Sequence, residues 1–252
     1  MYSEANPIST LKTYNEFMVL LTQDKSYDPC DGYYCNSTRM IYDAITYVFA
    51  RDFSEQDKFT LINTIIDHPK FNPNYKRSSH PMISKCLKLE KSENVRRYFF
   101  NKITNHDDID KWHYGNQQNC TPQFNFRENI NYNYYASNKH GIMDIHVCIC
   151  SKIPDAEKEY YLTIIIKNMN NVTVRDDDDK FSPIDYCTNK YLFETEKGRQ
   201  NIINLITNHH AFHYSRKKVH PYNGEYISLL EYCILKKDDY LADKIMHKLS
   251  HL

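Results

Sequence analysis

The chain has 252 residues, of which 41% are hydrophobic and 25% are charged, and its 32 basic side chains equal its 32 acidic ones. This balance argues against proteins that bind nucleic acids or anionic membranes, because both classes need an excess of basic residues. No apolar run approaches the length of a transmembrane helix, and the N-terminus lacks a basic-then-apolar signal, so we expect neither a membrane-spanning nor a conventionally secreted protein.

The first predicted element is a helix that begins near Ser9. Thr13 and Glu16 have the spacing of a capping box, in which the two residues satisfy each other's backbone N–H groups. Apolar side chains recur at helical spacing, with Phe17 beside them, on a face formed by Leu11, Tyr14, Met18 and Leu21. We expect this segment, with the turn-rich loop up to residue 36, to cover the open end of the helices that follow.

A two-helix pattern then recurs five times, each copy having a short helix that carries a small residue and a longer apolar helix. The copy at residues 181–216 is the clearest, because Ser182 can cap the first helix, Pro183 suits its first turn, and Ile184 with Cys187 shares one face. In the third copy, the alternation at 146–150 leaves a short strand as an alternative to the first helix. We expect the small positions to be buried at Ala44, Cys86, His146, Cys187 and Cys233.

The repeated unit resembles the ankyrin repeat, whose first helix opens with Thr-Pro-Leu-His-x-Ala. Variants of this opening occur at Arg39–Ala44, His80–Cys86 and Ser228–Cys233, and a looser one at Gly141–His146. The exit at residues 67–74 (DHPKFNPN) is similar to the family's Glu-His-Gly-Ala-Asp-Pro-Asn. The resemblance implies an all-α repeat solenoid with an N-terminal cap at 1–36. Its degenerate repeats would lie at 37–77, 78–116, 139–175, 181–216 and 225–252. The chain departs from the family in having only 5 glycines.

Residues 117–138 do not fit the repeat and form a long polar insertion with interleaved aromatic residues. The only tryptophan, Trp112, lies just before it, where ankyrin proteins project a loop between repeats. Trp and Tyr are enriched at protein interfaces, so we expect a partner to contact this region. The predicted contact residues are Trp112, Tyr114, Phe124, Phe126, Tyr132, Tyr134 and Tyr135, with Tyr75, Asp177 and Asp178 from neighbouring loops at the rim.

The resemblance implies a monomeric, non-enzymatic protein–protein interaction module without a cofactor. The chain is rich in Asn, Tyr, Lys and Ile and poor in Gly, as in proteins from AT-rich genomes. In this respect it is similar to ankyrin proteins of intracellular bacteria and large DNA viruses, which act on host proteins. That likeness implies an effector or adaptor in the cytoplasm, or one delivered into the host cytoplasm by a non-classical route.

An enzyme is the alternative, namely a Cys/His-dependent hydrolase or transferase. Its nucleophile would be Cys30, Cys35 or Cys120, with the site in the N-terminal loop or the 117–138 insertion. Metal spacings also occur at Cys30/Cys35, at His209/His213 and around His146. They lack the second ligand pair of a zinc finger and the glutamate of HExxH, so we expect no metal. Cysteines at core positions of the repeat favour a reducing compartment.

Overall fold

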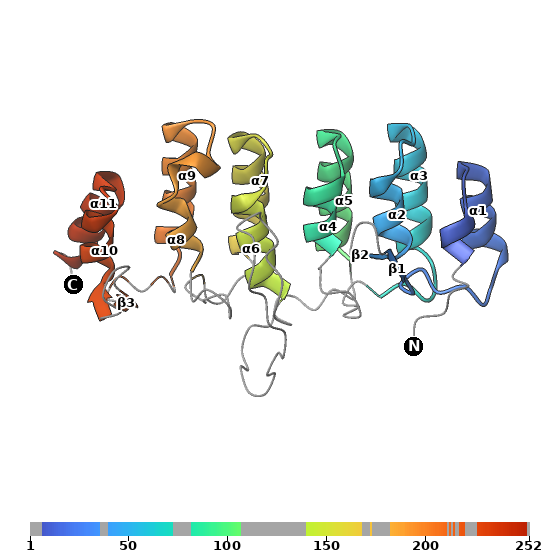
Figure 1. Ribbon diagram of the computed structural model, residues 1–252, viewed down its shortest axis with the longest axis horizontal. Helices are drawn as coiled ribbons and strands as arrows, with labels where there is room; N and C mark the ends of the chain where they lie inside the picture. Colours follow the sequence, from blue (N-terminus) through green and yellow to red (C-terminus); the bar gives the residue numbers. More distant parts are fainter. Residues whose placement is uncertain are drawn as a thin grey trace. The chain divides into compact units, whose positions relative to one another are not determined.

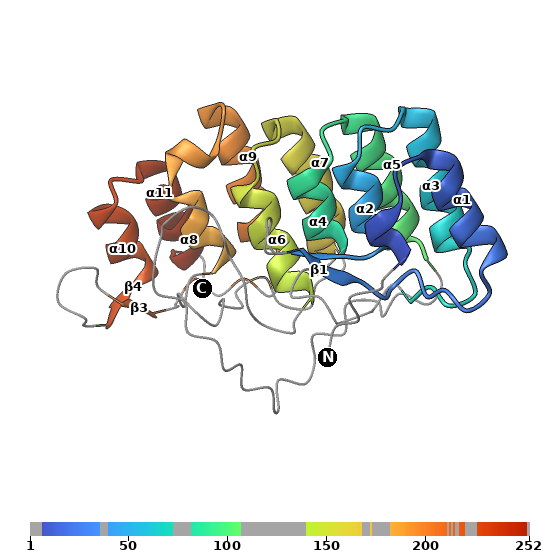
Figure 2. The ribbon, with the colours of Figure 1, turned by 45° about the vertical axis from the view of Figure 1, so that its right-hand side comes forward.

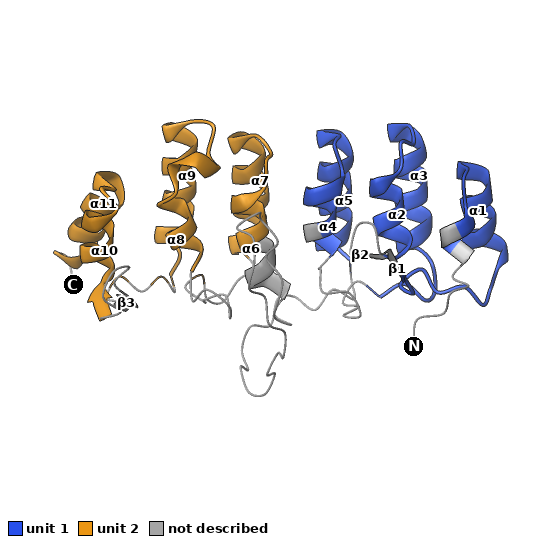
Figure 3. Ribbon diagram, in the orientation of Figure 1, with its two compact units in different colours: residues 1–111 blue, residues 112–252 orange. Residues whose placement is uncertain are grey.

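The computed structural model describes residues 7–35, 40–72, 82–106, 140–167, 172, 182–210, 212, 214, 217–219 and 226–250. The chain forms two compact units, residues 1–111 (unit 1) and 112–252 (unit 2), shown in different colours in Figure 3. The expected helical fold class is confirmed, because α-helices dominate both units. Two short antiparallel strand pairs accompany the helices in the described segments, and the sequence had not predicted them.

Unit 1 contains one single helix followed by two helix pairs (Figure 1). Helix α1 packs against α3, α2 packs against α3 and α4, and α5 packs against α3 and α4. First helices therefore stack on first helices and second helices on second helices. The elements are the 3-10 helix η1 (Pro7–Thr10), α1 (Tyr14–Gln23), β1 (Tyr33–Cys35), β2 (Met40–Tyr42), α2 (Ala44–Ala50), α3 (Glu55–Ile66), α4 (Met82–Leu89) and α5 (Glu93–Thr104).

Unit 2 contains three helix pairs, which Figures 1 and 2 show from two directions. Helix α6 packs against α7 and α8, and α9 packs against α7 and α8, which repeats the stacking of unit 1. Helix α10 packs against α11 and against the strand pair that precedes it. The elements are α6 (His140–Cys150), α7 (Asp155–Lys167), α8 (Pro183–Cys187), the 3-10 helix η2 (Lys190–Leu192), α9 (Glu196–Thr207), β3 (Lys217–Val219), β4 (Tyr226–Ser228), α10 (Leu229–Leu235) and α11 (Asp239–Leu249).

The capping signals predicted from the sequence lie at helix starts, although α1 begins at Tyr14 and not near Ser9. Thr13 and Glu16 form a capping box at α1, and Ser182 forms one at α8 with Pro183 in the first turn. The predicted apolar face of α1 was wrong, because the buried face is rotated from it by part of a helical turn. Leu11, Tyr14 and Met18 are only half-buried, because α1 instead buries the side chains of Phe17, Leu20 and Leu21. The Phe17 ring packs edge-on against Tyr47 of α2, with 5.0 Å between centroids.

The predicted start of the first helix pair was also wrong. Met40–Tyr42 was read as the opening of a helix, but it forms β2 and pairs with β1, with Met40 opposite Cys35. Helix α2 begins only at Ala44, because the side chain of Asp43 caps it by accepting a hydrogen bond from the Thr46 amide at 2.9 Å. Conversely, 146–150 belongs to helix α6, so the strand alternative is excluded.

The small residues expected in the core are buried at Ala44, Cys86, Cys187 and Cys233, but two of the copies were misaligned. Cys86 lies six residues before Ser92, the residue that precedes the second helix of its pair. Val48 and Cys148 stand at the same distance before the second helices α3 and α7, and both are fully buried. These two residues therefore take the positions that the resemblance had assigned to Ala44 and His146.

Replacing Cys187 with leucine should lower the free energy of unfolding by about 1–3 kcal/mol, because extra methylene groups must enter a filled core. Cys187 is fully buried, and its Sγ lies 3.5 Å from the Pro183 carbonyl oxygen. Urea unfolding followed by circular dichroism measures the change. An unaltered stability would contradict tight packing at this site, and Cys187→Ala serves as the comparison for lost rather than added volume.

Candidate functional site

Every predicted partner-contact residue lies outside the described residues. This holds for Trp112, Tyr114, Phe124, Phe126, Tyr132, Tyr134, Tyr135, Tyr75, Asp177 and Asp178. The 117–138 insertion, Cys120 and His213 also lie outside them. The predicted contact region stays a prediction, and the described residues supply the candidates below.

A buried basic residue recurs in the second helix of four helix pairs. It stands four positions after the residue that precedes the helix, namely Ser54, Ser92, Pro154 or Thr195. Lysine or arginine on an amphipathic helix usually faces solvent, so the sequence pattern did not predict that these side chains are buried. Their constant spacing from the helix start was the available signal. The four residues are Lys58, Arg96, Lys158 and Arg199, and all are buried.

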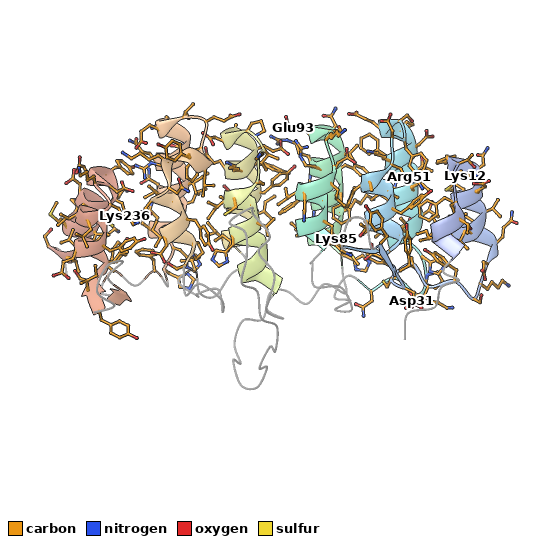
Figure 4. All side chains as sticks on the ribbon, viewed as in Figure 1. Lys12, Asp31, Arg51, Lys85, Glu93 and Lys236 are labelled. Carbon is orange, nitrogen blue, oxygen red and sulfur yellow. The ribbon has the colours of Figure 1, made fainter. Side chains whose placement is uncertain are left out.

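In unit 1 these buried cations are paired with carboxylates or carbonyl groups. Lys58 Nζ on α3 lies 2.7 Å from Glu90 Oε2, in the loop before α5. Arg96 donates to the Glu90 carbonyl oxygen at 2.8 Å. A second buried pair joins the first helices, because Lys85 on α4 (labelled in Figure 4) lies 2.5 Å from the α2 cap residue Asp43. The Lys58–Glu90 and Lys85–Asp43 contacts connect one helix pair to the next, whereas the Arg96–Glu90 contact lies within the second pair.

In unit 2 the same position again reaches toward the following helix pair. Lys158 on α7 donates to the Leu192 carbonyl oxygen, and its Nζ lies 5.1 Å from the Phe193 ring centroid. Burial lowers the pKa of Lys158, while nearby Asp155 opposes that shift. The carboxylate of Asp155 also accepts hydrogen bonds from the Thr195 amide at 2.8 Å and the Glu194 amide at 3.1 Å.

Gly198 permits this close approach of α9 to the start of α7. A Cβ atom at position 198 would overlap the carboxylate of Asp155. The glycine is therefore required by the packing of the two second helices, and it occupies the first turn of α9.

Arg199 makes the most extensive of these contacts. Its Nη1 and Nη2 donate to the two carboxylate oxygens of Asp238 at 2.7 and 3.1 Å. Nη1 also donates to the Cys187 carbonyl oxygen at 3.0 Å, and Nη2 to Glu196 at 2.7 Å. Burial alone would lower the pKa of Arg199, but the hydrogen bonds with Glu196 and Asp238 raise it overall. Three of the four buried cations, Lys58, Lys158 and Arg199, thus contact the helix pair that follows their own.

The thiol of Cys30 is poorly suited to be a nucleophile. Its Sγ accepts a hydrogen bond from the Asn72 amide at 3.3 Å and lies 3.7 Å from the Asn72 carbonyl oxygen. Burial raises the pKa of Cys30 to about 12. The thiolate is the reactive form, so this shift disfavours attack at neutral pH. Burial likewise raises the pKa of Cys233 to about 12.

The described segments also bear on metal binding and on membrane insertion. No group of three or more His, Cys, Asp or Glu side chains there is arranged to hold a metal ion. None of the helices in these segments is long and apolar enough to cross a lipid bilayer.

An open groove of about 420 Å³ lies on the surface of unit 2 between the second helices α7 and α9. Asn201 Nδ2 donates to Glu159 Oε2 across the groove at 2.9 Å, and Asn204 Oδ1 accepts from the Tyr240 hydroxyl at 2.9 Å. Asn208 and Thr163 are exposed. The lining combines polar groups with apolar surface and consists of Glu159, Thr163, Ile166, Lys167, Asn201, Asn204, Leu205, Asn208 and His209.

The equivalent surface of unit 1 is filled by aromatic side chains. Between α3 and α5 the rings of Phe59 and Tyr98 lie 4.6 Å apart, and the Tyr98 hydroxyl donates to Asn63 at 2.7 Å. Tyr98 is the sixth residue after Ser92, and Asn201 is the sixth after Thr195. A shorter side chain at this position therefore leaves the groove of unit 2 open.

Comparisons with protein-family models, curated proteins and solved structures gave no match for this chain.

Proposed function

We propose that this chain is a divergent ankyrin-like repeat protein that binds another protein without catalysing a reaction. The supporting observation is the constant register of its second helices. Counted from the residue before each helix, position four is a buried cation in four of the helix pairs. Positions seven, eight and eleven are buried and apolar in the same helices: Leu61, Ile62 and Ile65; Phe99, Phe100 and Ile103; Tyr161, Leu162 and Ile165; Ile202, Ile203 and Ile206.

This register supports a binding scaffold because the core lies between neighbouring helix pairs. In repeat arrays each unit buries its apolar face against the next, while its outer surface and loops remain free to vary. The charged side chains buried in the second helices join consecutive helix pairs, as in the Lys58–Glu90 and Arg199–Asp238 contacts. The surface that remains for function is the outer one, where the α7–α9 groove lies.

The chemistry of the groove suits an extended polypeptide segment. Asn201, Asn204 and Asn208 are spaced by three and four residues, so they lie along one side of α9. A side-chain amide both donates and accepts hydrogen bonds, and it therefore complements the N–H and C=O groups of a peptide backbone. Glu159 and Lys167, near opposite ends of α7, add one charge of each sign. We infer that a partner strand lies along α9 and is held mainly through its backbone.

Asn201→Tyr should weaken partner binding at least about tenfold, because the new ring would fill the groove as Tyr98 does in unit 1. The probe is a peptide selected from a random phage-displayed library on the wild-type protein. Its dissociation constant is then measured by fluorescence anisotropy for both proteins. The melting temperature should change little, since the groove has room for the ring.

Lys197→Tyr is the matched control, because it adds the same side chain to an exposed position of α9 outside the groove. It should leave the dissociation constant unchanged. A library that yields only peptides insensitive to Asn201→Tyr would show that this groove is not the binding surface. The predicted contact region around Trp112 would then be tested with Trp112→Ala.

A further inference from the structure

The last helix pair of unit 2 consists of α10 and α11. It exposes apolar side chains, and in α11 these stand at positions that are buried in the earlier second helices. In α11 the eighth and eleventh positions are Met246 and Leu249, which are 47% and 39% exposed. Their counterparts in α3, α5, α7 and α9 are at most 2% exposed. The two side chains are apolar like those of the core, although no helix of the described segments covers them.

Helix α10 shows the same feature at the residue that follows its buried small side chain. This residue is Ile234, which is 61% exposed. The corresponding residues Phe49, Leu87 and Ile149, which follow Val48, Cys86 and Cys148, are buried, and in α8 the position holds the half-buried, polar Thr188. The exposed apolar residues Ile234, Met246 and Leu249, here called the terminal face, come from both helices of the pair, α10 and α11, which Figure 2 labels. Exposed apolar side chains gathered on one helix pair indicate an interaction surface.

The terminal face lacks the contact that joins one helix pair to the next. Where the four earlier second helices carry a buried lysine or arginine, α11 carries Ala242. That cation reaches the following pair in the contacts of Lys58, Lys158 and Arg199. A helix pair packed here would lack the contact that Lys58, Lys158 and Arg199 make. An occupant of the terminal face would therefore be held by apolar contacts and by the charges around them.

Charge around the terminal face favours a basic occupant. Asp239 and Asp243 precede Met246 by seven and three residues, so they share its side of α11. Both are exposed, and neither forms a salt bridge within the described part of the chain. Lys244 and Lys248 stand two residues from Met246 and therefore point to the opposite side. Lys236, labelled in Figure 4, lies over the Tyr232 ring, with 5.6 Å between Nζ and the centroid.

We propose that the terminal face binds an amphipathic helix of a partner protein, with basic residues flanking its apolar stripe. The stripe would cover Ile234, Met246 and Leu249, and lysine or arginine would neutralise Asp239 and Asp243. A second copy of this chain fits less well, because two terminal faces brought together would oppose their aspartates. The site is separate from the α7–α9 groove and does not depend on it.

The test uses two synthetic helical peptides with the same leucine stripe, flanked by lysines in one and by glutamates in the other. The lysine peptide should bind the full chain at least about tenfold more tightly, and this preference should shrink at high salt. Met246→Glu should lower its affinity at least about tenfold. The double variant Asp239→Asn/Asp243→Asn should retain binding but lose most of the preference for lysine.

Val19→Glu and Asn201→Tyr should leave peptide binding unchanged, the first because Val19 is an exposed apolar residue of unit 1 and the second because it alters only the groove. Circular dichroism checks the folding of each variant, and Leu249→Gln replaces Met246→Glu if that variant fails to fold. Equal affinities for the two peptides, or binding of the lysine peptide that survives Met246→Glu or Leu249→Gln, would overturn the proposal. A dimer in sedimentation that Met246→Glu converts to a monomer would also overturn it, in favour of a second copy.

Discussion

Replacing Arg199 with methionine should lower the free energy of unfolding of unit 2 by about 3–5 kcal/mol, because it leaves the carboxylate of Asp238 buried without a counter-charge. The Asp238 side chain is fully buried, and its carboxylate accepts hydrogen bonds from Nη1 and Nη2 of Arg199. Methionine fills much of the same volume, so the loss reports the charge rather than a cavity. Urea unfolding gives the energy, and hydrogen exchange should show faster opening of α8 to α11.

Two variants make this prediction specific. Asp238→Asn combined with Arg199→Met should recover much of the loss, because asparagine removes the buried charge and still caps a helix well. Arg97→Met breaks an exposed contact with Glu93 and should cost less than about 1 kcal/mol. If Arg199→Met and Arg97→Met lower the free energy of unfolding by the same small amount, the Arg199 contact does not stabilise the junction between α9 and α11.

Replacing Lys85 with methionine should destabilise unit 1 to a similar extent, about 3–5 kcal/mol, because it removes the counter-charge of a buried carboxyl group, that of Asp43. The side chains of Lys85 and Asp43 are 2% and 4% exposed. Asp43 also accepts hydrogen bonds from the Thr46 amide and hydroxyl, so its carboxylate cannot turn toward solvent without uncapping α2. Hydrogen exchange should therefore quicken first in α2 and α4.

The control for this prediction is Lys91→Met, which removes an exposed lysine from the same unit and should change stability by less than about 0.5 kcal/mol. The double variant Asp43→Asn/Lys85→Met should be more stable than Lys85→Met alone, since the amide keeps the cap without the charge. Additive losses in the double variant would show that the two side chains do not interact.

Helix starts were predictable because their signals are local. Thr13 and Glu16 satisfy the first backbone N–H groups of α1 with residues within one turn, and Pro183 removes one such N–H group from the first turn of α8. The same chemistry could have corrected the start of α2, since Asp43 precedes Thr46 by three residues. The resemblance to the family motif instead placed the helix start at Met40–Tyr42. The pairing of this segment with residues 33–35 as strands was therefore missed.

The partners of the buried cations and the open groove could not be predicted from the sequence, because each depends on two segments far apart in the chain. Lys58 and Glu90 are separated by 32 residues, and Arg199 and Asp238 by 39. Amphipathic periodicity assigns such side chains to solvent unless the partner is known. The open groove required knowing that Asn201 and Tyr98 occupy equivalent positions, which only aligned helix pairs could establish.

The dependence of Arg199 on Asp238 has a consequence for the order in which the chain is made. On the ribosome, α9 emerges before Asp238, which follows Arg199 by 39 residues. Until then the nascent α8–α9 pair holds a guanidinium matched only by Glu196 and the Cys187 carbonyl group, and it stays open to chaperones and proteases. Helix α11 carries Ala242 in place of that cation, so α10 and α11 can close as soon as they are synthesised.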